Sequence, residues 1–446
     1  MRRTLNMLFQ VKDNIWFNND SIKIFTGDDY HKTECITVPA RKSVPSVHDE
    51  NWKPTIIYLA ATSCNLKCKY CYADEGTYGI KEEKKQFTFD DYLQTYTKMK
   101  ELHGGIKAIS FFGGEPLLNY REIRKFVEYL HETYDSDEIP ALSVNTNGTI
   151  LNQEILEFLG KYHFIIGTSV DGTKAIHDEN RVADHLESTY DIVKGNLKRF
   201  QDTGLNVFVQ YTFTRQHLDS FQPGKVEEWC REMEELPINT YELIPVSTTD
   251  PRYRLNLEDE ETAQKYKIFC EETADYYLDK LLSGDVSKVP RMFMGLVIRL
   301  LMQVEQRDCS AGYSFSITPN KKIYPCHTFT EHDEYGVNFS DLHHKSDLDH
   351  NVFFVKAKES GRDKNTMCDK CISKKVCGVW CKGLQNNVLG EMNAPMNERC
   401  MLMRIYTVRI IRFLAEHYET KKTVINRKLI AYNRLHKELK GVNYES

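Results

Sequence analysis

The stretch TIIYLAATSCNLKCKYCYADEG, residues 55–76, decides the fold. It begins with an apolar, β-branched run that is typical of a buried strand. Three closely spaced cysteines, Cys64, Cys68 and Cys71, follow directly after this run. Clustered cysteines are candidate metal ligands, so the stretch predicts a metal site at the end of a strand.

Six strand-like runs alternate with amphipathic helical patterns. The runs are 55–60, 108–112, 142–146, 164–170, 206–213 and 241–246. One of the helices is predicted to start after Thr88 as its N-cap and to end before Gly104. Six successive strand–helix units predict an α/β fold, a partial (β/α)6 TIM-like barrel. Chemistry in such folds lies at the carboxyl ends of the strands, where the cysteines follow the first strand.

The composition is that of an ordinary soluble protein. The chain has 446 residues, is 41% hydrophobic and 28% charged, and has a net charge of −5. No overall basic field favours nucleic acid, no apolar run is long enough for a bilayer, and no signal peptide is apparent. We therefore expect a cytoplasmic protein without nucleic-acid or membrane partners. Thirteen cysteines in a reducing compartment favour metal ligands over disulfides.

The spacing Cys64-x3-Cys68-x2-Cys71 favours an iron–sulfur cluster over zinc. A four-iron cluster needs one ligand per iron, so three cysteines leave one iron open to a small molecule. A structural zinc site is the alternative. Zinc prefers four ligands in paired C-x2-C spacings, which this triplet does not provide.

With Tyr70 in its aromatic position, the triplet resembles the signature of the radical S-adenosylmethionine (SAM) superfamily. The resemblance covers about residues 55–250. It implies a [4Fe-4S] cluster that binds SAM and cleaves it to a 5′-deoxyadenosyl radical, which abstracts hydrogen from a substrate. It also implies an electron donor such as flavodoxin or ferredoxin.

Further motifs at the ends of predicted strands resemble the SAM-binding elements of this superfamily. SFFGGEPLL contains Gly113 and Gly114, which are expected to let the backbone approach the ligand, and Glu115, which is expected near the SAM amino group. The motifs NTNG and GTSVDG are expected to line SAM through Asn145, Asn147 and Ser169.

Arg181, in the motif HDENR, resembles the partner of the SAM carboxylate. A bidentate arginine–carboxylate pair suits that role. The alternative is a solvated surface charge.

Seven further cysteines lie towards the C-terminus. They are Cys309, Cys326, Cys368, Cys371, Cys377, Cys381 and Cys400. Their spacing resembles the SPASM domain, which carries auxiliary four-iron clusters; a structural zinc site is again the alternative.

By this resemblance, one auxiliary cluster is held by Cys368, Cys371, Cys377 and Cys400, and a second by Cys309, Cys326 and Cys381. The protein would then carry three [4Fe-4S] clusters. The fourth ligand of the second auxiliary cluster stays open, because a non-cysteine side chain, water and a substrate thiolate are all compatible with the sequence.

The motif ITPNKKIYPCHTF, residues 317–329, is expected to form a hairpin of the SPASM domain. The family usually has glycine where this chain has Lys321, and we expect Asn320 to supply the left-handed turn residue instead. His327 follows the cysteine of this motif. It is a candidate general base, since the ordinary pKa of histidine lies near neutral pH, or else a structural residue of the hairpin.

Four regions follow from these patterns. They are a short β-rich extension with a linker at 1–54, the radical SAM barrel with bridging helices at 55–300, the SPASM region at 301–400, and basic helices at 401–446.

SPASM radical SAM proteins mostly modify peptides or proteins, so the resemblance implies a maturase. The first hypothesis is that it forms a thioether or carbon–carbon crosslink in a ribosomally made precursor peptide. The alternative is an anaerobic sulfatase maturase that oxidises Cys or Ser to formylglycine. That family carries aspartate at the position of His327, which argues against it. A non-catalytic iron–sulfur redox or interaction protein is the hypothesis of another class.

Overall fold

The computed structural model describes residues 7–27, 34–35, 52–80, 84–306 and 309–440. Six parallel strands form most of the main sheet in the order β12-β11-β9-β8-β7-β5. They are β5 (Thr55–Ala61), β7 (Ala108–Gly113), β8 (Ala141–Thr146), β9 (Ile165–Val170), β11 (Asn206–Phe213) and β12 (Thr240–Pro245). These six strands confirm the strand predictions, and no strand end moves by more than one residue.

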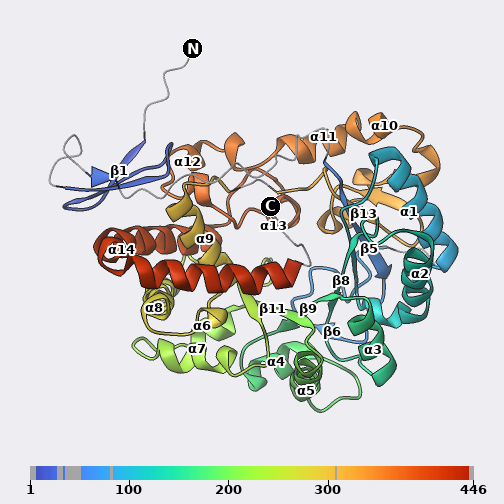
Figure 1. Ribbon diagram of the computed structural model, residues 1–446, viewed down its shortest axis with the longest axis horizontal. Coiled ribbons are helices and arrows are strands. Elements are labelled where there is room, and N and C mark those ends of the chain that lie inside the picture. The colour runs from blue at the N-terminus through green and yellow to red at the C-terminus, as the bar shows by residue number, and fades with distance from the viewer. Residues whose placement is uncertain (1–6, 28–33, 36–51, 81–83, 307–308, 441–446) are drawn as a thin grey trace.

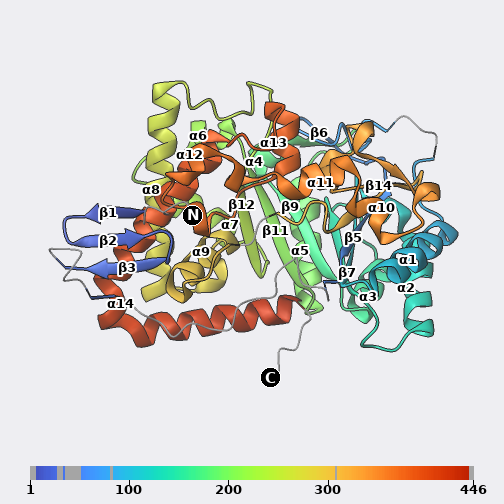
Figure 2. The same cartoon turned by 90° about the horizontal axis from the view of Figure 1, so that it is seen from above.

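Helices cover the outside of these strands (Figures 1 and 2). The helices between the strands are α1 (Phe89–His103), α2 (Tyr120–Thr133), α3 (Gln153–Lys161), α4 (Lys174–Asn180), α5 (Thr189–Asp202), α6 (Arg215–Ser220) and α7 (Val226–Glu234). The prediction for α1 is confirmed. Thr88 is its N-cap and forms a capping box with Asp91, and Gly104 ends it with φ 66°.

The main sheet continues into the region expected to be a separate cysteine-rich domain. Strand β13 (Phe315–Ile317) pairs in parallel with β5, so that Phe315 lies opposite Ile56. Strands β14 (Lys322–Tyr324) and β15 (Val337–Asn338) follow in antiparallel order. The expected hairpin therefore forms as part of the main sheet. Among the described residues, neither β12 nor β15 pairs with a further strand, so this sheet is open.

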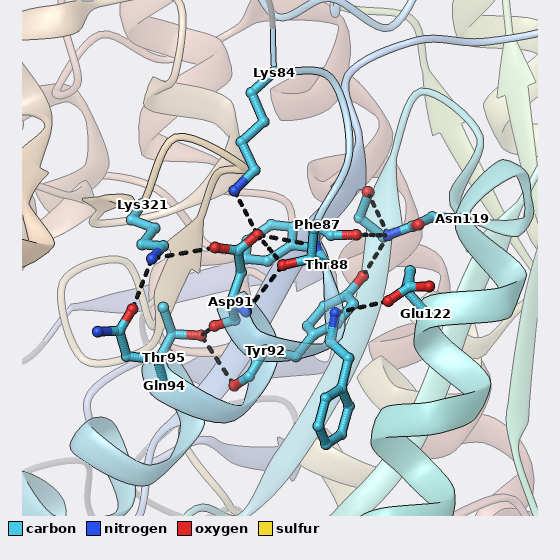
Figure 3. A network of polar contacts seen from close by, with 12 residues as sticks. Lys84, Phe87, Thr88, Asp91, Tyr92, Gln94, Thr95, Asn119, Glu122 and Lys321 are labelled. Atoms are coloured by element: carbon cyan, nitrogen blue, oxygen red, sulfur yellow. Dashed lines mark hydrogen bonds and ion pairs between the residues drawn. The ribbon is translucent and has the colours of Figure 1, made fainter.

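Lys321 is the left-handed residue of the β13–β14 turn, with φ 60°. The expectation that Asn320 would take this conformation is wrong. The Lys321 ammonium lies 3.1 Å from Asp91 Oδ1 and donates to Gln94 Oε1 at 2.6 Å. Figure 3 shows these contacts, which tie the hairpin to the first turns of α1. They hold a lysine in a backbone conformation that normally favours glycine.

The C-terminal region forms one 44-residue helix, α14 (Asn397–Lys440). It packs along α8 (Glu260–Leu282) and against the N-terminal sheet, to which Lys12 Nζ adds an ion pair with Glu416 Oε1 at 2.7 Å. The sheet consists of β1 (Leu8–Lys12), β2 (Ile15–Asn18), β3 (Lys23–Thr26) and β4 (Glu34–Cys35). Side chains of the sheet, α8 and α14 join the same hydrophobic core as the six parallel strands.

The remaining elements connect these layers. They are β6 (Lys67–Cys68), β10 (Arg181–Val182), α9 (Arg291–Met302), α10 (Lys345–Asp349), α11 (Val352–Glu359), α12 (Thr366–Asp369) and α13 (Lys382–Leu389). Most of the linker expected before residue 55 lies outside the described residues. None of the helices that the structure describes has the length and apolar character needed to span a bilayer.

Candidate active site

Cys64, Cys68 and Cys71 line one cavity of about 130 Å³ beside the carboxyl ends of the parallel strands. Six of the residues predicted to contact SAM also line it, and they come from β7, β8, β9 and the segment after α4. These are Gly113, Gly114, Asn145, Asn147, Ser169 and Arg181. The structure thus brings together residues that are distant in the sequence, at the edge of the sheet where the fold predicts chemistry.

Gly113 and Gly114 line the cavity and also let two segments of backbone pack closely against each other. A Cβ on Gly113 would lie 2.3 Å from the Ala61 carbonyl oxygen, and one on Gly114 would lie 2.2 Å from that of Ser63. Both glycines therefore let β7 approach the start of the cysteine loop. This close approach of two backbones adds to the expected approach to a ligand.

Glu115 is fully buried and does not line the cavity. Its carboxylate accepts hydrogen bonds from the Asn147 backbone N–H at 2.8 Å and from the Thr146 hydroxyl at 2.8 Å. Burial raises the pKa of Glu115 to about 7, although these hydrogen bonds act in the opposite direction. In this structure Glu115 supports Thr146 and Asn147, which do line the cavity.

Arg181 is buried beside the cysteine loop and is held by Asp171. Its Nε lies 3.0 Å from Asp171 Oδ1, and the exposed fractions of the two side chains are 8% and 0%. The Tyr70 hydroxyl donates to the other oxygen of Asp171, and the Arg181 guanidinium lies 5.6 Å from the centre of the Tyr70 ring. Arg181 is therefore not a solvated surface charge. It lines the cavity, and its Nη1 lies 4.0 Å from Cys68 Sγ.

Sequence reasoning missed Asp171, although it is part of the quoted GTSVDG motif. The backbone of Asp171 is fixed on both sides, because its N–H donates to His177 Nδ1 at 3.3 Å and its carbonyl oxygen lies 3.1 Å from His217 Nε2. An acidic residue directly after a strand, ten residues before an arginine, is too weak a signal to identify this pair from one sequence.

The donor set around this cavity fits a cluster better than a single ion. Burial raises the pKa of Cys68 to about 12, against the effect of Arg181, so a metal must displace the thiol proton. The part of the chain that the structure describes contains no three His, Cys, Asp or Glu side chains arranged to hold one metal ion. A four-iron cluster spreads its cysteine ligands over several iron atoms, and three thiols around one cavity suit that arrangement.

The C-terminal cysteines gather in the two predicted sets. Cys368, Cys371, Cys377 and Cys400 line one small cavity of about 30 Å³. Cys309, Cys326 and Cys381 lie close enough to influence one another electrostatically. Each set could hold a cluster. Two of the other thiols, those of Cys230 and Cys270, are buried in the main core.

His327 lies between the second set and the cavity that Cys64, Cys68 and Cys71 line. Its Nδ1 is 3.4 Å from Cys326 Sγ, and its ring lies 4.6 Å from that of Phe112, a residue that lines the cavity. Burial raises the pKa of Cys326, but His327 and Thr328 together outweigh it, and the pKa falls to about 7. Cys326 in return raises the pKa of His327 against the effect of burial. His327 is therefore placed for proton transfer near the cavity, besides any role in the hairpin.

Comparisons with known proteins identify the domain to which the residues lining the first cavity, hereafter the SAM-side cavity, belong. Residues 58–222 match the family model of the radical SAM superfamily. Residues 58–222 are a radical SAM domain. The chain is accordingly an enzyme, rather than the non-catalytic protein considered from the sequence, and its cofactors are SAM and a [4Fe-4S] cluster.

Three known proteins are similar to this chain over most of its length. A cysteine-type anaerobic sulfatase-maturating enzyme of Clostridium novyi (strain NT) is 27% identical over 388 residues, which are 80% of this chain and 98% of the relative. The solved structure of native anSMEcpe with bound AdoMet has a TM-score of 0.62 at 20% identity and covers 84% of this chain and 99% of that one. Streptococcus suis SuiB bound to S-adenosylmethionine has a TM-score of 0.52 at 16% identity, with 78% and 77% covered. The two structures show the shared fold.

Proposed function

We propose that this radical SAM enzyme is a maturase that oxidises a cysteine side chain of a peptide or protein substrate. The observation that carries this proposal is the position of His327 between the SAM-side cavity and the second cysteine set. A substrate side chain bound near Phe112 and His327 would lie beside a hydrogen-abstracting site and beside a base. The names of two similar proteins support a protein or peptide substrate, since one is a sulfatase-maturating enzyme and SuiB has been solved with a precursor peptide, SuiA.

Each group of residues would have one task. Cys64, Cys68 and Cys71 would hold the SAM-binding cluster, and Asn145, Asn147, Ser169 and Arg181 would hold SAM. The two C-terminal cysteine sets would hold auxiliary clusters. When bound, SAM and the clusters would supply a hydrogen-abstracting radical and an acceptor for the remaining electron. A flavodoxin or ferredoxin would supply the reducing electron.

The chain's own residues would manage charge and protons around the substrate. Arg181, fixed by Asp171, would pair with the carboxylate of SAM through its terminal nitrogens. His327 would accept the substrate thiol proton on Nε2, because its Nδ1 faces Cys326. The tyrosine and phenylalanine rings beside His327, Tyr72 and Phe112, would limit the access of water.

Two products are compatible with this oxidation. Conversion of Cys to formylglycine is supported by similarity to a cysteine-type sulfatase-maturating enzyme over 98% of its length. The first hypothesis from the sequence, a thioether or carbon–carbon crosslink, has no comparable support. Formylglycine is therefore the favoured product. One observation still favours the crosslink. The set of Cys309, Cys326 and Cys381 has three thiols, and a substrate thiolate would supply the fourth ligand of a four-iron cluster.

The experiment uses anaerobically reconstituted enzyme, SAM, dithionite and a synthetic peptide that contains the cysteine segment of a sulfatase. We expect 5′-deoxyadenosine together with an aldehyde in place of the thiol, detected by mass spectrometry and by reaction with a hydrazine. A peptide that loses only two hydrogen atoms and keeps its sulfur would identify the crosslink instead. SAM cleavage without change in any cysteine peptide would contradict the proposed substrate class.

A further inference from the structure

A second cavity, of about 610 Å³, lies along the outer edge of the parallel sheet. Its volume is within the range of about 300–1,000 Å³ that is usual for ligand sites. It is lined by four consecutive residues of β12, by α9, by Gln306, by residues 378–381 and by three residues of α14, and it shares no lining residue with the SAM-side cavity. Figure 2 shows α9 beside β12 at this end of the sheet.

The cavity follows a strand edge that carries unused backbone groups. Strand β12 is the terminal strand and pairs only with β11 among the described residues. The Val246 N–H donates to the Phe213 carbonyl oxygen at 2.8 Å, on the β11 side. Successive residues of a strand direct their backbone groups to opposite edges, so the N–H and C=O of Leu243 face the cavity. Pro245, two residues further on the same edge, has no N–H, and its carbonyl oxygen accepts from Arg399 Nη2 at 3.5 Å, so Leu243 offers the pairing groups. An extended peptide can add to such an edge as a further strand.

The charges around this cavity are mainly positive. Arg291, Arg299 and Arg399 line it, and Glu242 is its one acidic lining residue. Arg291 Nε lies 3.5 Å from Glu242 Oε1, whereas Arg299 and Arg399 form no ion pair with a described carboxylate. The Nε of Arg299 is buried and has no hydrogen-bond partner among the described residues. Burial lowers the pKa of Arg299 to about 10, although Cys377 and Glu242 act in the opposite direction.

Two glycines make room for the Arg299 guanidinium. A Cβ on Gly295 would lie 3.0 Å from Nη1, and one on Gly378 would lie 3.4 Å from Nη2. Glycine inside a helix costs about 0.5–1 kcal/mol relative to alanine. Gly295, between Arg291 and Arg299 on α9, opens the helix face that the two arginines share.

The spacing of these arginines matches an extended chain. The Arg299 guanidinium lies beside Gly295, four residues from Arg291 on α9, which corresponds to about 6 Å along the helix axis. Residues two apart in a strand are separated by about 7 Å and lie on the same face. Two acidic side chains two residues apart in an extended peptide would therefore meet both guanidinium groups.

The cavity also borders the catalytic region. The Arg291 guanidinium lies 5.3 Å from the centre of the Phe208 ring, and Phe208 lines the SAM-side cavity. Cys381, from the second cysteine set, lines the cavity beside β12. A peptide bound along β12 would thus lie one side chain away from the proposed reaction site.

We propose that this cavity binds an extended, acidic segment of the peptide substrate, which adds to the free edge of β12 and pairs two carboxylates with Arg291 and Arg299. The inference rests on the proposed function, because it assigns the recognition of that peptide to a place outside the reaction site. Compensation of cysteine thiolates would account for Arg399, which acts on Cys381, and in part for Arg299, on which Cys377 acts. It does not account for Arg291, which is paired with Glu242 and lies over Phe208.

The test measures binding without catalysis. Two fluorescein-labelled decapeptides of Thr and Val are compared by fluorescence anisotropy with reconstituted enzyme in the absence of SAM. One carries Glu at two positions two residues apart, and the other carries Gln at the same positions. We expect the Glu peptide to bind at least about tenfold more tightly, because charge-assisted hydrogen bonds to buried guanidinium groups are lost with Gln.

Three variants make the outcome specific. The double variant Arg291→Gln/Arg299→Gln should bind both peptides equally. Arg231→Gln, which removes an exposed arginine of α7, should keep the preference. Glu242→Gln should increase the preference for the Glu peptide, since this change removes the one acidic lining residue. This variant tests the site even if the double variant fails to fold.

Equal binding of the two peptides by the natural protein, or a Glu preference that survives in Arg291→Gln/Arg299→Gln, overturns the inference. Either result leaves the proposed oxidation intact if a cysteine peptide is still converted. Conversely, a preference for the Glu peptide in a protein that converts no cysteine peptide supports this binding site and contradicts the proposed function alone.

Discussion

Arg181 pairs with Cys68 through the backbone, as the two residues lie opposite each other in the short antiparallel sheet of β10 and β6. The Lys69 N–H adds a hydrogen bond to the Asn180 carbonyl oxygen at 2.9 Å. The loop that carries the cysteines is therefore attached to the segment that carries the arginine. A ligand that bridges a cluster and Arg181 would find both in one fixed unit, which lowers the conformational entropy lost on binding.

The first prediction concerns Asp171, which positions Arg181. Asp171→Asn should weaken SAM binding by about tenfold or more, because the guanidinium loses its charged partner and its orientation. Equilibrium dialysis with radiolabelled SAM under anaerobic conditions measures this loss, and the iron content should not change. Asp184→Asn is the matched control, since Asp184 forms only an exposed ion pair with Lys67. Full SAM affinity in Asp171→Asn would show that Arg181 needs no such support.

The second prediction concerns the pH dependence of stability at Glu115. Its pKa is raised by burial from 4.5 to about 7, so the unfolded chain loses this proton at lower pH than the folded protein. Stability should therefore fall as pH rises from 4.5 to 7, by about 3 kcal/mol at most. Urea unfolding across this range should show the decline in the natural protein and in the exposed control Glu154→Gln. Glu115→Gln should lack it, and an unchanged pH slope in that variant would exclude Glu115 as the cause.

The third prediction separates backbone strain from charge at Lys321. Lys321→Met keeps the left-handed strain and loses the ion pair with Asp91, whereas Lys321→Gly loses both. The glycine variant should be more stable than the methionine variant by about 1 kcal/mol. Thermal unfolding of the two variants measures the difference. Equal stabilities would mean that the turn relaxes without glycine.

The fourth prediction concerns His327 as a base. His327→Phe keeps an aromatic ring beside Phe112 but cannot take a proton. Product formation should fall by about a hundredfold or more, while SAM affinity stays the same. His327→Asp should restore part of the activity. Normal product formation in His327→Phe would leave His327 with a structural role only.

The sequence was sufficient for the local elements and for the edge where the site forms. The six parallel strands were predictable from apolar runs that alternate with helical patterns. The start of α1 was predictable as well, because the capping box of Thr88 and Asp91 involves residues close together in the sequence. The pairing of β13 with β5 was not predictable in this way. The two strands are distant in the chain, and the residues that pair are ordinary apolar ones.

The site residues show the same limit. A motif identifies Glu115 and Arg181 as polar residues near a ligand, but it does not tell whether each faces the ligand or supports the protein. Glu115 accepts hydrogen bonds from Thr146 and Asn147, and Arg181 forms an ion pair with Asp171. Lys321 differs from the expected Asn320 by one position, because a side-chain contact with α1 outweighs the intrinsic turn preference of asparagine.

Anaerobic production of 5′-deoxyadenosine from SAM tests whether Cys64, Cys68 and Cys71 hold the reactive cluster. The reconstituted natural protein should release it with dithionite, and Cys270→Ala, which changes a buried core thiol, should do the same. Replacement of Cys64, Cys68 and Cys71 by Ala should abolish the release and remove about four irons per chain, leaving those of the auxiliary sites. Release of 5′-deoxyadenosine by that triple variant, or none from iron-loaded natural protein, would contradict the assignment.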